Sequence, residues 1–260
     1  MEFTVPRDDL WTRDQLLLAL RLYMRLPFGK LHRGNPDIIG LASKIGRTSN
    51  AMAMKACNFA NLDPALQARG IRGLSNLSNA DRAMWSEFSN NSEALAAEAE
   101  EAACRIGIAG TVDATAGDLL RMPASETDVE RVIRARRVQS FFRAAVLTTY
   151  GSRCALSGIS TGELLTASHI IPWSSSIERR ADPRNGICLN ALFDRAFDRG
   201  LFTFDQEFRV ILTPQLRTAS NDARLACSLD QLEGQPLLMP ARFPPDAQAI
   251  RFHRENIFLG

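Results

Sequence analysis

The spacing of apolar residues near the start of the chain predicts an amphipathic helix. In residues 11–30, WTRDQLLLALRLYMRLPFGK, the side chains of Leu16, Leu20 and Tyr23 recur at intervals of three and four. This is the spacing of one face of a helix. Thr12 precedes the run and is a residue type that caps helix starts. We therefore expect a helix that begins directly after Thr12.

Residues 35–64 show the same helical spacing in two shorter segments. Gly46 separates them, the second can be capped by Thr48 or Ser49, and it ends near Pro64. The stretch LASKIGRTSNAMAMK resembles the turn of helix-turn-helix DNA-binding units, in which a small residue and a Gly-Arg pair precede the second helix. A glycine also connects consecutive helices in ordinary helical bundles. A DNA-binding unit and a plain helical bundle therefore both stay open as interpretations.

The resemblance to a helix-turn-helix implies a set of DNA contacts. In such units the N-terminal residues of the second helix lie in the major groove. Carried over to this chain, the candidate DNA-binding residues are Arg47, Thr48, Ser49, Asn50 and Lys55.

A change of composition marks a connector in the middle of the chain. Residues 91–128 are first rich in alanine and glutamate and then in glycine, threonine and alanine. This composition indicates an exposed helix followed by a loose segment. We therefore expect a helical domain at 1–90, an acidic, flexible connector at 91–128 and a second domain at 129–260.

The charge follows nearly the same division. Residues 1–88 carry 12 Lys and Arg against 8 Asp and Glu (12 − 8 = +4), and residues 89–128 carry 2 against 8 (2 − 8 = −6). Residues 129–260 carry 17 against 13 (17 − 13 = +4). An anionic partner such as nucleic acid could meet both basic blocks, because the local field matters more than net charge. The solvated surface of a soluble enzyme would explain the same numbers.

The second part of the chain mixes helix and strand patterns. Residues 126–151 have the pattern of a long helix with many arginines, and residues 164–171, LLTASHII, have that of a strand. Residues 185–200 indicate a short strand that runs into a helix closed by glycine, and the alternation in 201–214 predicts a hairpin. The fold class predicted for the whole chain is α+β.

A strand, loop, strand and helix in this order place four chemically active side chains close together. His169 ends the first strand, Asn185 precedes the second, and Asp194 and Asp198 lie one helical turn apart. Histidine can take a proton from water near neutral pH, and a carboxylate is a natural ligand for Mg²⁺. Hydrolysis of a phosphodiester requires both functions.

At these residues the chain resembles a known family. The segments SHIIPW and DPRNGICLNALFDRAFDRGL are similar to the HNH (ββα-metal) endonucleases, in particular to the restriction-endonuclease-like branch, and the resemblance covers about residues 131–212. It implies that His169 is the general base, that Asn185 orients it and that Asp194 binds the metal. It also implies a Mg²⁺ or Mn²⁺ cofactor and makes the second domain a nuclease domain.

Two positions depart from the family pattern. Many HNH enzymes have Asp or His directly before the base as a metal ligand, where this chain has Ser168, and Asp194 stands where His or Asn is usual. We expect Asp194 to be the main ligand, Ser168 to assist weakly, and Asp198 either to contribute or to hold the helix end. Arg195 and Arg199 on the same helix are candidate phosphate contacts.

The remaining cysteines and histidines predict no second site. Five cysteines are scattered singly without a C-x-x-C pair, so no structural zinc is expected and a reducing cytoplasm is the expected location. His32 and His253 are expected to have packing or surface roles. No apolar run reaches the length of about 20 residues that a membrane span needs.

Together these patterns predict a metal-dependent DNA endonuclease, of restriction type, that acts on double-stranded DNA as a homodimer. Removal of the first 120 or so residues should then leave a stable nuclease domain without sequence specificity. One alternative is a DNA-binding regulator with a degenerate HNH domain. Another is an RNase or a secreted toxin, against which the helix-turn-helix resemblance counts.

Overall fold

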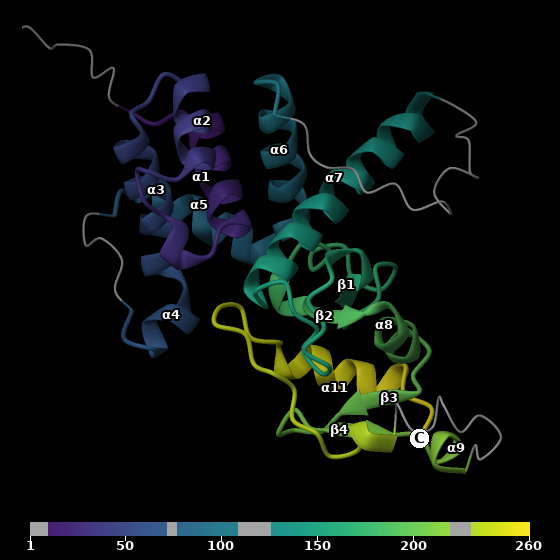
Figure 1. Cartoon of the computed structure of the whole chain (residues 1–260). Helices are drawn as coiled ribbons and strands as arrows, with labels where there is room; N and C mark the ends of the chain where they lie inside the picture. Colours follow the sequence, from purple (N-terminus) through teal and green to yellow (C-terminus); the bar gives the residue numbers. More distant parts are fainter. Residues whose placement is uncertain (1–9, 72–76, 109–125, 219–229) are drawn as a thin grey trace, which may run out of the picture.

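The chain has an α+β fold in which helices come first and both sheets follow (Figure 1). A computed structural model describes residues 10–71, 77–108, 126–218 and 230–260. The helices before the first strand are α1 (Arg13–Arg25), α2 (Pro36–Lys44), α3 (Ser49–Leu62), α4 (Pro64–Ala68), α5 (Asn79–Asn90), α6 (Ser92–Arg105) and α7 (Glu126–Thr149).

The predicted helix starts in the first part are confirmed. The Thr12 hydroxyl accepts from the backbone N–H of Gln15 at 3.3 Å, and the Gln15 side chain accepts from the Thr12 N–H at 3.2 Å. Thr48 caps α3 in the same way by accepting from the N–H of Ala51 at 3.1 Å. Between α2 and α3, Gly46 has a φ of 68°, a left-handed conformation that glycine adopts at little cost.

The helix expected to be exposed in the connector is buried instead. α6 packs against α1 and α7, and the alanines and leucine of one face are inaccessible. The guanidinium of Arg21 and the carboxylate of Glu100 form a buried ion pair of 2.9 Å between α1 and α6. Alanine side chains let helices approach closely. The alanine-rich sequence of α6 is therefore as compatible with a buried helix face as with an exposed one. Residues 109–125 of the expected connector lie outside the described residues.

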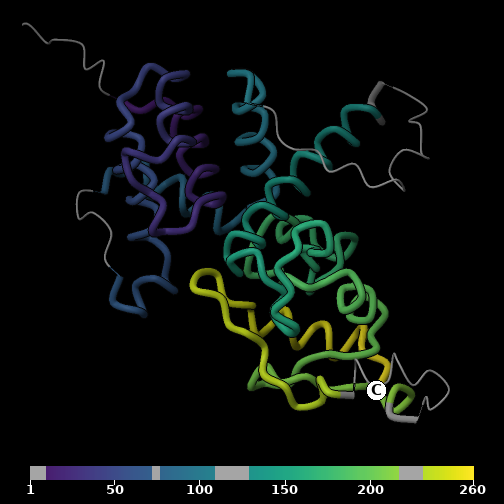
Figure 2. The backbone as a smooth tube through the Cα atoms, viewed as in Figure 1, coloured from purple at the N-terminus to yellow at the C-terminus, as the bar shows by residue number. Residues whose placement is uncertain are grey.

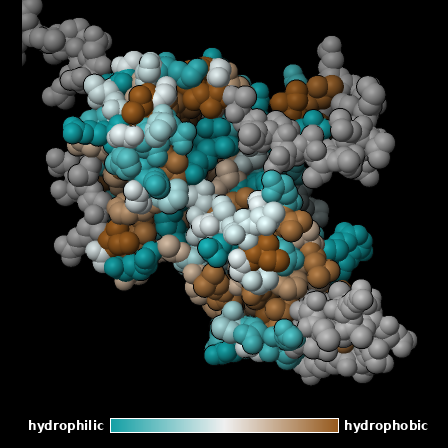
Figure 3. All heavy atoms as spheres, in the orientation of Figure 1, coloured by the Kyte–Doolittle hydropathy of each residue, from teal (hydrophilic) through white to brown (hydrophobic). Residues whose placement is uncertain are grey.

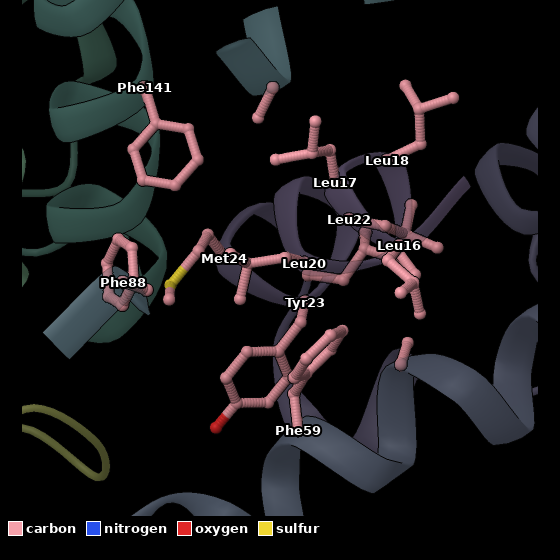
Figure 4. Close-up of a cluster of buried hydrophobic side chains, with 14 of the residues drawn as sticks. Leu16, Leu17, Leu18, Leu20, Leu22, Tyr23, Met24, Phe59, Phe88 and Phe141 are labelled. Carbon is pink, nitrogen blue, oxygen red and sulfur yellow. The ribbon is translucent and has the colours of Figure 1, made fainter. Parts of the chain in front are cut away.

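Helix α7 belongs to two hydrophobic cores at once. Phe141 packs into the core of the helical part, where Figure 4 shows it facing Phe88 and Met24. The next residue, Phe142, and Val146 pack into the second core with the strands. Successive side chains are about 100° apart around a helix, so Phe141 and Phe142 can pack into different cores.

The second part contains two small antiparallel sheets. Strand β1 pairs with β2 so that His169 lies opposite Gly186, and β3 pairs with β4 as the predicted hairpin. The predicted strand-to-helix segment is also confirmed, because α8 follows β2 directly. The elements are β1 (Leu165–His169), β2 (Gly186–Asn190), α8 (Ala191–Asp198), β3 (Phe202–Phe204), β4 (Val210–Leu212), α9 (Pro214–Thr218) and α11 (Ala247–Asn256).

The segment before α11 returns to the helical part of the chain (Figure 2). Arg242 is buried and donates to the backbone carbonyl of Tyr23 at 3.0 Å. Phe243 stacks on Trp85 with 6.1 Å between ring centroids, and Arg69 donates to the carbonyl of Ala241 at 2.9 Å. Residues of the second part therefore complete the core of the helical part, and the expectation that the second part is stable by itself remains a prediction.

Polar side chains cover much of the visible surface, and apolar ones lie among them in small groups (Figure 3). Exposed apolar residues include Ile39 and Met54 on the helical part and Leu192 on α8. Within the described ranges, no helix combines the length and the apolar character that a membrane crossing requires.

Candidate functional site

His169 is held at the end of β1 in one ring orientation. Its ring stacks on Phe142 of α7 with centroids 3.8 Å apart and planes 13° from parallel. Its Nε2 lies 2.9 Å from the backbone oxygen of Arg180. A carbonyl oxygen can only accept, so Nε2 carries the hydrogen. The other nitrogen, Nδ1, keeps its lone pair, because the one hydrogen bond of the ring within the described residues is made by Nε2.

Burial keeps this ring neutral. Desolvation lowers the pKa of His169 to about 4, and the hydrogen bond to the Arg180 carbonyl opposes that shift only in part. At neutral pH the imidazole is therefore uncharged. An uncharged imidazole with an open Nδ1 can accept a proton, which is the requirement for a general base.

His253 provides a comparison within the same chain. Its ring stacks on Phe197 at 3.7 Å, and its Nε2 donates to the Phe197 carbonyl at 3.1 Å. Here, however, Nδ1 accepts from the Thr203 hydroxyl at 2.9 Å. Both nitrogens are thus satisfied in the core, which agrees with the expected packing role of His253. His32 is exposed, as a surface role requires.

Asn185 holds the loop beside His169 rather than the ring itself. Its side-chain oxygen accepts from the N–H of Ile171 at 2.8 Å. Its amide donates to the carbonyl of Ile171 at 3.1 Å and to the carbonyl of Arg179 at 3.3 Å. Because Arg179 precedes the residue that binds the histidine ring, Asn185 orients His169 through the backbone.

Helix α8 packs against β1 and carries two of the predicted metal ligands, Asp194 and Asp198. The Asn190 side chain caps α8 by accepting from Phe193 N–H at 3.0 Å. Burial raises the pKa of Asp194, against the effect of the Ser168 hydroxyl and of Arg195. The Ser168 hydroxyl is buried and makes no hydrogen bond of normal geometry within the described residues. The Asp194 carboxylate and the Ser168 hydroxyl therefore lie close together. The carboxylate is partly desolvated, and the hydroxyl makes no hydrogen bond of normal geometry within the described residues.

Asp198 lies one turn further along α8 and is exposed at its outer edge. Desolvation raises its pKa to about 6, and the negative charge of Asp194 adds to this effect. The two carboxylates are therefore close enough for the charge of Asp194 to raise the pKa of Asp198. No group of three or more His, Cys, Asp or Glu side chains that could hold a metal ion occurs in the described ranges, at this site or at any other.

The strand pair followed by α8 is the arrangement in which the active side chains were expected. Residues 154–205 match the family model of HNH endonucleases. The matched HNH segment contains His169, Asn185 and Asp194, and it supports nuclease activity. The matched segment is shorter than the range of about 131–212 over which the sequence resembles the family. A search of curated proteins finds no match to the chain.

Two arginines extend from the HNH segment into solvent. Arg195 lies on α8 and Arg199 directly follows its last residue, and both arginines are exposed. Each can reach an anionic ligand that approaches the carboxylates.

The candidate DNA contacts of α3 differ in their availability. Arg47 donates to the carbonyl of Leu10 at 2.8 Å and to the side chain of Gln15 at 3.1 Å. Lys55 is buried in an ion pair with Asp81 at 2.8 Å, so the structure does not present it to DNA. Thr48 uses its hydroxyl as the α3 cap, Ser49 is half-buried, and Asn50 is exposed.

Three residues that support His169 were not singled out in the sequence: Phe142, Arg180 and Gly186. Arg180 binds the His169 ring through its backbone carbonyl, and any residue type at this position would supply that carbonyl. Gly186 follows the motif asparagine, Asn185. In the structure it lies against α7, where a Cβ atom would be 2.4 Å from Val146 and 2.8 Å from Phe142. Glycine is therefore required for the strand to pack on the helix that stacks on His169.

Gly186→Ala is expected to lower the free energy of unfolding by about 1–3 kcal/mol, the usual cost of overpacking a core. Denaturant unfolding would measure the loss. Gly162→Ala is the matched control, because a Cβ there meets nothing within 4 Å. Equal stabilities of the two variants would contradict the packing argument.

Proposed function

We propose that the chain is a metal-dependent DNA endonuclease in which His169 is the general base. The observation that carries the proposal is the open Nδ1 of a neutral histidine whose Nε2 is fixed by a carbonyl. It lies in the segment that matches HNH endonucleases. His253 shows that the fold can satisfy both nitrogens where the residue has only a packing role.

The side chains around His169 prepare it for proton transfer. Nδ1 takes the proton from the attacking water, while the Arg180 carbonyl holds Nε2–H and stabilises the charge that the ring acquires. The stack on Phe142 limits rotation of the ring. Asn185 fixes the loop that carries the Arg180 carbonyl. A positioned base of this kind typically contributes about 10²–10⁴-fold to the rate.

The proposed ligands of a divalent cation are two carboxylates of α8 and the hydroxyl of Ser168 on β1. Asp194 and Asp198 are carboxylates with raised pKa values, and the buried Ser168 hydroxyl lacks a normal partner. A cation would compensate all three groups. Mg²⁺ or Mn²⁺ held there would neutralise negative charge on the phosphate and on the leaving oxygen. Few protein ligands suffice, since Mg²⁺ usually keeps several waters.

The substrate of this proposal is double-stranded DNA, cut in a restriction-type reaction. Arg195 and Arg199 contact phosphates, and the start of α3 supplies contacts through Arg47 and Asn50. Phosphate contacts position a protein on DNA but carry no sequence information. Sequence specificity therefore requires the contacts of Arg47 and Asn50. A homodimer with two-fold symmetry would cut both strands of a symmetric site.

Incubation with supercoiled plasmid in Mg²⁺, Mn²⁺ or EDTA tests the proposal. Nicked and linear DNA should appear with either metal and not with EDTA. DNA binding without any metal-dependent nicking would instead identify a regulator with a degenerate HNH domain.

Asp194→Asn is expected to raise the Mn²⁺ concentration for half-maximal cleavage more than Asp198→Asn does. Asp194 is the more buried of the two and lies against Ser168, whereas Asp198 is exposed. Metal titrations of the cleavage rate would measure the difference. A larger effect of Asp198→Asn, or tightly held zinc in the purified protein, would overturn the ligand assignment.

A further inference from the structure

Three consecutive backbone carbonyls hold side chains from three different elements. The carbonyl of Glu178 accepts from the Ser92 hydroxyl at 2.7 Å. The next carbonyl, of Arg179, accepts from Asn185, and the third, of Arg180, accepts from Nε2 of His169. Two of these donors belong to the HNH segment. Ser92 opens α6 of the helical part, 86 residues earlier in the chain than Glu178.

Residues 173–181, which contain these carbonyls, lie between the helical part and His169. Ala181 is fully buried in the core of the helical part, and Trp173 packs against that core. The edge of Trp173 also contacts the His169 ring, with centroids 5.7 Å apart. Arg180 donates to the Trp173 carbonyl at 2.9 Å and lies over its ring.

We infer that Ser92 is a positioning residue of the nuclease centre. Its hydroxyl fixes the Glu178 carbonyl and thereby the peptide planes up to Arg180, whose carbonyl sets the tautomer and the ring orientation of His169. The helical part is then a structural component of the catalytic site as well as a candidate DNA-binding unit. This inference rests on the proposed function.

The physical basis is that, within the part of the chain that the structure describes, the His169 ring has one hydrogen bond, from Nε2 to the Arg180 carbonyl. Nε2 bonds to a single carbonyl, so a rotation of that peptide moves the ring or frees Nε2–H. Ser92 is 3% exposed, so water does not readily replace its hydroxyl. Misplacement of a catalytic group by about 1 Å can cost about 10²-fold in rate.

Cleavage assays on the full chain test the inference with four variants. Ser92→Ala and Ser92→Val remove the hydroxyl, and Ser92→Thr keeps it at nearly the shape of valine. Ser89→Ala is the matched control, because the Ser89 hydroxyl bonds only within its own helix and is exposed. We expect Ser92→Ala and Ser92→Val to lower kcat about 10- to 100-fold with DNA affinity unchanged. Ser92→Thr should restore most of kcat.

Nitrogen-15 NMR of the histidine rings gives a readout that does not depend on cleavage. The chain has three histidines, so the signals can be assigned by substitution. Wild-type His169 should be a single tautomer with hydrogen on Nε2, and Ser92→Ala should give a mixture. His253 should stay unchanged in both, because its ring bonds to Thr203 and Phe197 and to no carbonyl of residues 173–181.

The outcomes separate this inference from the proposed function. If His169→Ala abolishes cleavage but Ser92→Ala cuts at the wild-type rate with one His169 tautomer, Ser92 does not position the base. A mixture of tautomers in the wild-type protein would overturn the inference even if every Ser92 variant failed to fold. Cleavage by His169→Ala at the wild-type rate would overturn the proposed function itself.

Discussion

His169→Ala is expected to lower the cleavage rate by about 10²–10⁴-fold, the usual contribution of a general base. DNA affinity should change little, because the ring acts on water and not on the DNA. The open Nδ1 is the only nitrogen of this side chain that is free to take the proton, and alanine removes it. Single-turnover cleavage at saturating protein, together with a DNA-binding titration, would separate the two effects.

His32→Ala is the control for this experiment, since His32 is an exposed histidine outside the HNH segment. It should cut and bind like the wild type. His253→Ala should act differently again, by reducing stability through loss of a buried and fully bonded side chain. A His169→Ala protein that cuts at the normal rate would show that the base lies elsewhere.

Residues 126–260 expressed without the helical part are expected not to fold cooperatively. Their Phe141, Val138 and Phe243 are buried in the core of the helical part. Burial of such a side chain contributes about 1.5–3 kcal/mol, so exposing three removes about 5–9 kcal/mol. This is comparable with the whole stability of a typical domain, about 5–15 kcal/mol. Thermal unfolding followed by circular dichroism, and limited proteolysis, would measure the effect.

The matched experiment supplies the missing half as a separate fragment. Residues 1–108 added to residues 126–260 should restore a cooperative transition, because the same contacts can form without the connection between them. A fragment 126–260 that unfolds by itself at the temperature of the full chain would show that the shared core adds little.

The sequence predicted the parts of the fold that depend on short-range signals. The caps at Thr12 and Thr48, the hairpin and the strand-to-helix step at Asn190 each rest on residues a few positions apart. The motif also predicted the order of a strand ending at His169, a second strand after Asn185 and a helix containing Asp194, and the structure has these elements in that order.

Long-range pairing could not be predicted in this way. Lys55 had the charge of a DNA contact, and its burial depends on Asp81, which lies 26 residues away. The alanine-rich face of α6 fitted exposure or burial equally, and only the presence of α1 and α7 decides between them. The bond from Ser92 to Glu178 involves a backbone atom, so no residue type in the sequence marks it.

The return of Arg242 and Phe243 to the helical part limits how this chain can be recombined with other proteins. A chimera that fuses another DNA-binding domain at residue 128 would leave one face of α7 and the Phe243 ring without the surface on which they pack. A workable crossover must therefore either transplant α1 to α6 together with the HNH segment or redesign both contacts at once. Substitution at exposed positions of α3, such as Asn50 and Met54, would leave both contacts intact.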